Sequence, residues 1–185
     1  MPGKILVYLA FAFSVAAMFG FFSVHRGKEK ALKFSRIAFL ASVFFVLCFS
    51  GFQLYNILTH QFQYTYVWQQ SNRELELGLL MSTFYAGQEG SFMLWTLMTA
   101  VIGLFLLNYV RKGDRLEPQV MSVFGLVLAF LNLILILKSP FNYVWESFPG
   151  EVQAGFVPAD GRGLNPLLQN FWMQIHPPTL FMGFS

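Results

Sequence analysis

Four apolar segments, each long enough to cross a membrane as a helix, constrain the fold of this chain more than any other feature. We place them at residues 5–24, 37–58, 77–110 and 120–137, and the third is most apolar from Phe92 onward. A helix needs about 20 largely apolar residues to cross about 30 Å of hydrocarbon. Only 11% of the residues are charged, whereas soluble domains carry about a quarter. The sequence therefore predicts an all-α integral membrane protein.

Basic residues are concentrated in two of the loops that join these segments. Eight of the twelve lie between the first and second segments or between the third and fourth: Arg26, Lys28, Lys30, Lys33, Arg36, Arg111, Lys112 and Arg115. Because loops rich in Lys and Arg stay in the cytoplasm, we expect the N-terminus to face outside, together with the second loop and residues 138–176. The net charge of +3 is then a topology signal, which predicts membrane lipid and not nucleic acid as a partner.

The long outward loop over residues 138–176 is expected to be largely irregular. Six of the eight prolines lie between Pro140 and Pro178. Residues 164–175, LNPLLQNFWMQI, have the composition of a short amphipathic helix on the outer surface. Tryptophan rings suit a membrane–water interface, and three fall in the outward loops: Trp68, Trp145 and Trp172.

A further apolar segment begins at Pro177, and only seven residues follow Pro178. Seven helical residues extend about 10 Å, which is too short to cross the hydrocarbon core. We therefore expect four transmembrane helices plus the start of a fifth. The chain is interpreted as the N-terminal fragment of a larger membrane protein, a split-gene product or a truncated reading frame.

Glu89 stands out because it lies between two glycines at the outer end of the third span, in the sequence STFYAGQEGSFMLW. An ionisable residue at such a position is a functional candidate unless it is paired or hydrated. Gly90 next to it would permit close approach of a neighbour or a ligand. A structural interpretation stays open, in which Glu89 sits in interfacial water and caps the helix near Ser91.

The sequence DGRGLNP, residues 160–166, is typical of a tight turn. Asp160 and Arg162 are expected to form a local ion pair there, and Asn165 precedes a proline. Arg162 could also contact a ligand carboxylate, because a guanidinium forms a bidentate pair with one.

His176 is the sharpest candidate for a metal-ligating residue, since Pro177 and Pro178 follow it directly. A residue before proline is disfavoured in the helical region, and proline is favoured at the first helical position. We therefore expect His176 at the N-cap of a helix that enters the membrane. The positive end of that helix would favour the neutral imidazole, which is the form that binds a metal. A histidine that only forms hydrogen bonds at the interface is the alternative.

Two of these motifs together resemble the N-terminal part of the CcmF family, the haem lyase subunits of cytochrome c maturation. They are GQEGSFMLW and DGRGLNPLLQNFWMQIHPPTLFMGF, and the resemblance runs from about Tyr64 to Ser185. It implies that His176 is an axial ligand of haem on the outer side, with Trp172, Pro177 and Pro178 positioning it. Many members have His where this chain has Gln88, so no ligand role is placed at that position.

The resemblance also implies an activity and its partners. Members attach haem covalently to apocytochrome c at the outer face of the cytoplasmic (inner) membrane. They receive haem from a small chaperone and work with subunits that hold the apocytochrome and handle its thiols. Their tryptophan-rich WWD segment and a second outer histidine are missing from this chain. We therefore expect it to need the C-terminal part of the same haem lyase and to be inactive alone.

Two other interpretations remain open from the sequence. The first is a non-catalytic subunit of a proton- or ion-translocating complex that uses Glu89, although a run of buried ionisable residues is missing. The second is a nonfunctional, unstable fragment.

Overall fold

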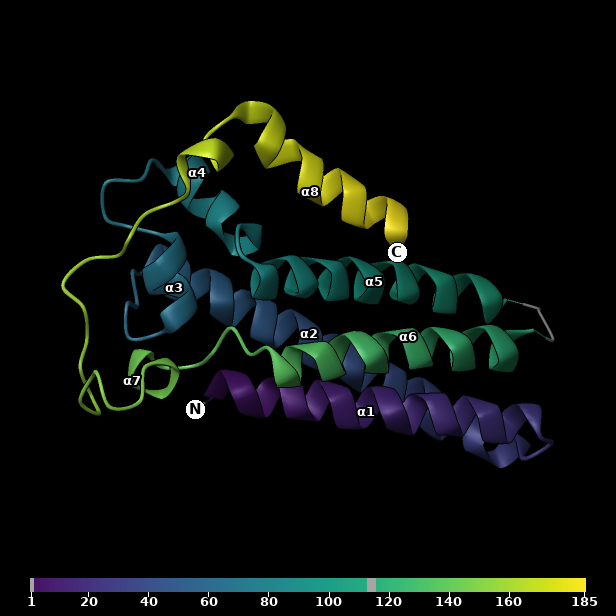
Figure 1. Ribbon diagram of the computed structural model, residues 1–185. Coiled ribbons are helices and arrows are strands. Elements are labelled where there is room, and N and C mark those ends of the chain that lie inside the picture. Colours follow the sequence, from purple (N-terminus) through teal and green to yellow (C-terminus); the bar gives the residue numbers. More distant parts are fainter. Residues whose placement is uncertain (1, 113–115) are drawn as a thin grey trace.

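The computed structural model describes residues 2–112 and 116–185 of the chain, apart from the side chain of Met173 (Figure 1). Four long helices dominate it: α1 (Pro2–His25), α2 (Leu32–Leu58), α5 (Gln88–Val110) and α6 (Glu117–Leu137). Each is long and apolar enough to cross a membrane. The described secondary structure is otherwise helical, apart from one isolated β-bridge between Tyr64 and Tyr143. The predicted all-α fold with four helices suited to crossing a membrane is therefore confirmed for the described residues.

Shorter helices connect and follow the long ones. They are η1 (Glu29–Ala31), α3 (Thr65–Gln70), α4 (Leu77–Ser82), η2 (Thr83–Tyr85), α7 (Val144–Ser147), η3 (Pro166–Leu168) and α8 (Phe171–Phe184). Helices α3, α4 and α7 gather at the same end of the bundle as the N-terminus (Figure 1). We call this end the cap and define it as residues 59–87 and 138–170.

The two basic loops lie together at the opposite end of the bundle from the cap (Figure 1). Lys33 and Arg36, expected in a loop, belong to the first turns of α2. The Arg36 guanidinium there donates to both carboxylate oxygens of Glu117, at 2.7 and 2.6 Å, and joins α2 to the start of α6. Arg115 lies outside the described residues. A basic end and an opposite cap are what the charge pattern predicts, while the side that each faces stays a prediction.

Small residues let the long helices approach closely. Helix α1 packs against α2 and α6, and α5 packs against the same two helices. The Ser42 hydroxyl of α2 donates to the carbonyl of Ala10 in α1 at 3.0 Å. A Cβ on Gly20 would lie 2.5 Å from the hydroxyl oxygen of Ser35. Such small-residue contacts are typical of packing between membrane helices, where hydrophobic burial supplies little driving force.

The third long helix begins at Gln88 and not at Leu77, so the predicted continuous span over 77–110 was wrong. Its first part folds separately as α4 and η2, and Gly87 is extended, with φ −95° and ψ 170°. Two hydroxyl groups near the break compete with backbone amides for the carbonyls. Ser82 and Thr83 each donate to a carbonyl three residues earlier, at 2.6 Å. The other three spans begin three to five residues earlier than expected, at Pro2, Leu32 and Glu117.

Candidate functional site on helix α8 and the cap

Helix α8 begins at Phe171, so His176 lies in its second turn. The expectation that His176 is an N-cap was therefore wrong. Asn170 is the N-cap, and its side-chain oxygen accepts from the amide of Trp172 at 3.0 Å. The expected amphipathic helix over 164–175 is also interrupted. Asn165 caps the separate turn η3 through the amide of Leu167 at 3.0 Å.

The second proline inside α8 is tolerated because another donor replaces its missing amide. Proline in a helix interior leaves the carbonyl four residues earlier without its usual N–H partner. Pro178 frees the carbonyl of Gln174, which accepts from the Tyr85 hydroxyl at 2.7 Å. Thr179 donates its hydroxyl to the carbonyls of Ile175 and His176, at 3.1 and 2.9 Å. The bond to Tyr85 also fastens α8 to the segment that precedes α5.

The imidazole of His176 lies on the exposed side of α8, away from α5. The opposite side of the helix contacts α5, where Phe181 stacks on Trp95 with 5.9 Å between ring centroids. Thr99 donates to the hydroxyl of Ser185 at 3.2 Å. Trp172, one turn before His176, is 73% exposed, and residues four apart share a helix face. The imidazole is therefore exposed beside a large apolar ring, and its role as a haem ligand stays a prediction.

Glu89 lies in the first turn of α5 and lines a small polar cavity of about 50 Å³. Its other lining residues come from α3, α7 and the segment before α7: Thr65, Tyr66, Gln69, Ser139, Asn142 and Ser147. A water molecule occupies about 30 Å³ of liquid volume, so the cavity has room for one or two. This cavity and the exposed face of His176 are separate features, and a functional role of Glu89 stays a prediction.

Gly90 is needed for packing beneath Tyr66. The buried Tyr66 hydroxyl donates to the carbonyls of Thr83 and Phe84, at 2.8 and 3.1 Å, and accepts from the amide of Gly87 at 3.2 Å. Burial raises the pKa of this hydroxyl above its ordinary value, so it stays protonated and can donate. A Cβ on Gly90 would overlap the Tyr66 hydroxyl and the Phe84 carbonyl. Sequence reasoning singled out Gly90 but missed Tyr66.

Arg162 docks the long loop on α3. Its amide donates to the carbonyl of Trp68 at 2.7 Å, and its guanidinium lies 4.2 Å from the centre of the Trp68 ring. The Asp160 carboxylate accepts from the amides of Arg73 and Gly161, at 3.1 and 2.7 Å. The ion pairs of the described residues join Lys4 to Glu146 and Arg36 to Glu117. The predicted pair of Asp160 with Arg162 is thus absent, because backbone amides satisfy the carboxylate.

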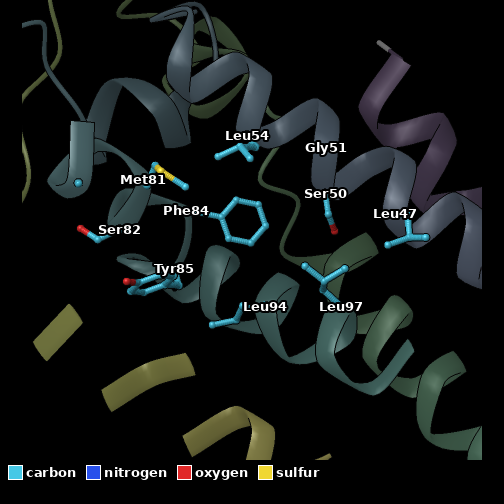
Figure 2. Close-up of a pocket in the computed structure, with 11 residues that line it drawn as sticks. Leu47, Ser50, Gly51, Leu54, Met81, Ser82, Phe84, Tyr85, Leu94 and Leu97 are labelled. Atoms are coloured by element: carbon cyan, nitrogen blue, oxygen red, sulfur yellow. The ribbon is translucent and has the colours of Figure 1, made fainter. Parts of the chain in front are cut away.

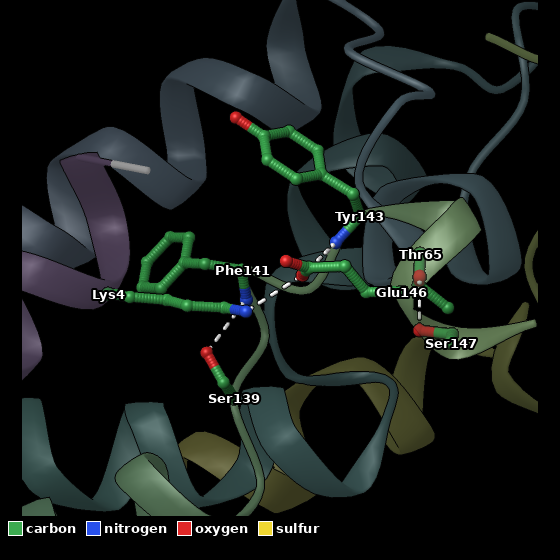
Figure 3. Close-up of polar contacts among 7 residues, drawn as sticks. All are labelled: Lys4, Thr65, Ser139, Phe141, Tyr143, Glu146 and Ser147. Atoms are coloured by element: carbon green, nitrogen blue, oxygen red, sulfur yellow. Dashed lines mark hydrogen bonds and ion pairs between the residues drawn. The ribbon is translucent and has the colours of Figure 1, made fainter. Parts of the chain in front are cut away.

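A polar network that the sequence did not reveal holds the cap on the bundle (Figure 3). The Lys4 ammonium of α1 lies 2.7 Å from the carboxylate of Glu146 in α7. The same carboxylate accepts from the amide of Tyr143 at 3.0 Å. Thr65 of α3 and Ser147 of α7 share a hydrogen bond of 2.7 Å. The partners in the Lys4–Glu146 and Thr65–Ser147 pairs are far apart in the sequence, so no local pattern could have paired them.

The Lys4–Glu146 pair gives the protein a testable dependence on pH. Burial acts to raise the pKa of Glu146, but hydrogen bonds from Lys4 and from the Tyr143 amide outweigh it and lower that pKa below 4.5. A pKa that is lower in the folded state than in the unfolded state stabilises the fold at pH values above the unfolded-state pKa. This stabilisation is lost as the pH falls through the folded-state pKa. We expect Glu146→Gln to remove the contribution, about 1 kcal/mol for a partly exposed pair. Thermal unfolding of both proteins from pH 7 to pH 3 checks this, and parallel curves would contradict it.

This chain is similar to several cytochrome c-type biogenesis proteins. The probable cytochrome c-type biogenesis protein NrfE of Escherichia coli is 34% identical over 83% of this chain and 26% of its own length. Cytochrome c-type biogenesis protein CcmF of Pseudomonas fluorescens is 30% identical over 98% of this chain and 27% of its own. CcmF of E. coli is 30% identical over 95% and 26%. No family model and no solved structure matches the chain.

The four membrane-capable helices and these similarities define a multi-pass membrane protein. The chain belongs with the CcmF and NrfE cytochrome c-type biogenesis proteins and matches their N-terminal part. It spans about a quarter of the length of these relatives. The resemblance that the two motifs indicated is thereby confirmed.

Proposed function

We propose that this chain takes part in the covalent attachment of haem to apocytochrome c, and that His176 is an axial ligand of the haem iron. The chain contributes one ligand and part of the surface that orients haem, while the porphyrin vinyl groups and the apocytochrome thiols carry the reactivity. The observation that carries the proposal is the exposed imidazole of His176 on the outward face of α8. It lies in a segment that belongs with cytochrome c-type biogenesis proteins.

The cap end of the bundle is where we propose that this chemistry takes place, at the outer face of the cytoplasmic membrane. Charge supports this orientation, because the basic loops lie at the other end (Figure 1). His176 is in the second turn of α8, and the Tyr85–Gln174 hydrogen bond holds that turn beside the start of α5. Pro178 contributes by freeing the Gln174 carbonyl that Tyr85 binds, and Pro177 directly follows the proposed ligand. Trp172 lies one turn before the ligand and offers an apolar ring to the macrocycle.

The proposed partners follow from the length of the relatives. The relatives extend well beyond the part that this chain matches. We propose that a region equivalent to their unmatched part supplies the opposite ligand and the remaining haem surface. It can belong to the same polypeptide or to a partner. A haem chaperone, apocytochrome c and the subunits that handle its thiols complete the proposed assembly.

Proton or ion translocation through Glu89 has less support. Every Asp, Glu, Lys, Arg and His of the described long helices lies within five residues of a helix end. A proton path across a membrane needs ionisable groups or water at intermediate depth. Glu89 itself lines a cavity at the cap, at one end of the bundle.

Deletion and re-expression in the organism of origin test the proposed function. We expect a strain without this chain to lose covalently bound haem from its c-type cytochromes, and re-expression of the chain to restore it. Haem staining of membrane proteins separated under denaturing conditions measures this directly, because only covalently attached haem survives. Unchanged c-type cytochromes in the deletion strain would overturn the proposal. A Glu89→Gln variant that alone abolished growth, with normal haem staining, would favour translocation.

A further inference from the structure

A pocket of about 450 Å³ opens at the basic end of the bundle, where the start of α2 lies near the end of α5. Four basic side chains line it, and they come from η1, from α2 and from the C-cap of α5: Lys30, Lys33, Arg36 and Arg111. One carboxylate, that of Glu29, also lines the pocket. Positive charge therefore exceeds negative charge among its described lining residues.

Most of this positive charge is not paired with carboxylates of the protein. Arg36 pairs with Glu117 at 2.6 Å, and the other ion pair of the described residues lies in the cap. Lys30, Lys33 and Arg111 are exposed, so their charge is available to a ligand. The apolar groove between α2, α4 and α5 (Figure 2) differs in this respect, because no charged side chain is found among the described residues that line it. The basic pocket, by contrast, selects an anionic group.

The place of the pocket along α2 matches the boundary between lipid headgroups and acyl chains. The membrane-capable segment Glu29–Leu58 has 30 residues and extends about 45 Å as a helix. This length equals the hydrocarbon core together with the headgroup layers on both sides, about 40–45 Å. Lys30 and Lys33, at the start of the segment, therefore lie at the level of the headgroups.

The pocket continues from its basic groups onto an apolar wall. Leu40 lies two turns after Lys33 on the same face of α2, about 10 Å deeper along the helix, and Ile37 lies between them. Both apolar residues line the pocket and are exposed, Ile37 by 55% and Leu40 by 40%. A basic region at headgroup level above an apolar wall at hydrocarbon level fits a ligand that carries a phosphate and an acyl chain.

We propose that this pocket binds one anionic glycerophospholipid. Its phosphate lies among Lys30, Lys33 and Arg111, and one acyl chain follows Ile37 and Leu40 into the hydrocarbon. Basic pockets between membrane helices are typical sites for anionic headgroups. Topology alone accounts for basic residues at this end of the bundle, but it does not require two helices to present them to one pocket. The site lies at the opposite end from the cap and does not depend on the proposed haem function.

Photolabelling of the full chain in phosphatidylcholine nanodiscs tests the proposal. Phosphatidylglycerol with a diazirine in one acyl chain is the anionic probe, and phosphatidylcholine with the same modified chain is the matched zwitterionic probe. Label on the peptide that contains residues 37–40 is divided by label near Phe130 of α6, a reference residue that is 58% exposed. We expect at least about fivefold more pocket label from the anionic probe in 0.1 M salt, a ratio that corresponds to about 1 kcal/mol. This preference should fall in 1 M salt, where the Debye length shrinks from about 10 Å to about 3 Å.

Charge removal provides the second arm of the test. Lys33→Gln and Arg111→Gln, at the ends of different helices, should each lower the preference for the anionic probe, and the two together should abolish it. Arg26→Gln combined with Lys28→Gln is the matched control, because it removes the same charge from the same end of the bundle and neither residue lines the pocket. This control should keep the wild-type preference.

Three results would overturn the proposal. Equal labelling by the two probes in the wild type would reject the site. Equal loss of preference in the pocket variant and in the control would show attraction to the whole basic surface and no single pocket. Displacement of the anionic probe by millimolar glycerol 3-phosphate, as effective as displacement by unlabelled phosphatidylglycerol, would identify a soluble phosphate ester as the ligand and reject the lipid.

Discussion

His176→Ala is expected to lower the accumulation of c-type cytochromes at least about tenfold, while the protein itself stays at its normal level in the membrane. The loss follows from the removal of an axial ligand, since about 1.4 kcal/mol of haem affinity already corresponds to a factor of ten. The imidazole is exposed, and alanine is a better helix former than histidine, so α8 should not be weakened. Haem staining of membrane proteins, with immunoblotting of the chain, measures both quantities.

His25→Ala is the control for this variant. His25 ends α1 at the basic end of the bundle, far from the cap (Figure 1). We expect the His25 variant to assemble c-type cytochromes at the wild-type level. Normal cytochromes in a stable His176→Ala strain would reject the ligand assignment, because the remaining described histidine, His60, lies in the cap and not on α8.

Gly90→Ala is expected to have the largest effect on stability. Its new methyl group would overlap the Tyr66 hydroxyl and the Phe84 carbonyl. Overpacking of this kind costs typically about 1–3 kcal/mol. In a chain of this length, such a loss corresponds to a decrease in Tm of about 2–12 °C. Thermal unfolding of the detergent-solubilised protein, followed by tryptophan fluorescence, measures the shift.

Gly51→Ala is the matched control for the stability prediction. Gly51 also lies inside a helix, but its Cβ would meet open space. Alanine is more favourable than glycine in a helix by about 1 kcal/mol, so this variant should be as stable as the wild type or more stable. Equal Tm values for the Gly90 variant and the wild type would show that the site beside Tyr66 has room for a methyl group, and would contradict the prediction.

The number and type of the long helices could be predicted because composition alone decides them. Uninterrupted apolar residues at this length have one stable arrangement in a membrane, which is a helix. The distribution of Lys and Arg then divided the loops into basic loops and loops with few basic residues. The structure places these two sets at opposite ends of the bundle (Figure 1). Both predictions rest on properties of whole segments, so they do not depend on individual side-chain contacts.

Helix boundaries near the cap could not be predicted because distant side chains set them. The Tyr66 hydroxyl takes the carbonyls of Thr83 and Phe84, which helps to end η2 before α5 begins. The Tyr85 hydroxyl satisfies the Gln174 carbonyl and so lets α8 continue through Pro178. Local rules for proline end the helix there, and they failed because a tertiary hydrogen bond replaced the missing amide.

The candidate site was found in part. His176 was identified from its two following prolines and from the motif resemblance, while its place in the second turn of α8 required the structure. Arg162 and Asn165 were chosen as possible functional residues, and both have contacts that account for them by loop docking and capping. Lys4 was overlooked, because its partner Glu146 is 142 positions away.

Haem bound by the affinity-tagged chain, isolated in mild detergent from membranes of its own organism, tests the central claim most directly. The wild-type preparation should contain haem, and His176→Gly should lose it. Added imidazole should then restore the haem content and the absorption spectrum of the variant, because a free imidazole can occupy the position of the missing side chain. Equal haem content in the wild type and His176→Gly, with no response to imidazole, would contradict the assignment of His176 as a haem ligand.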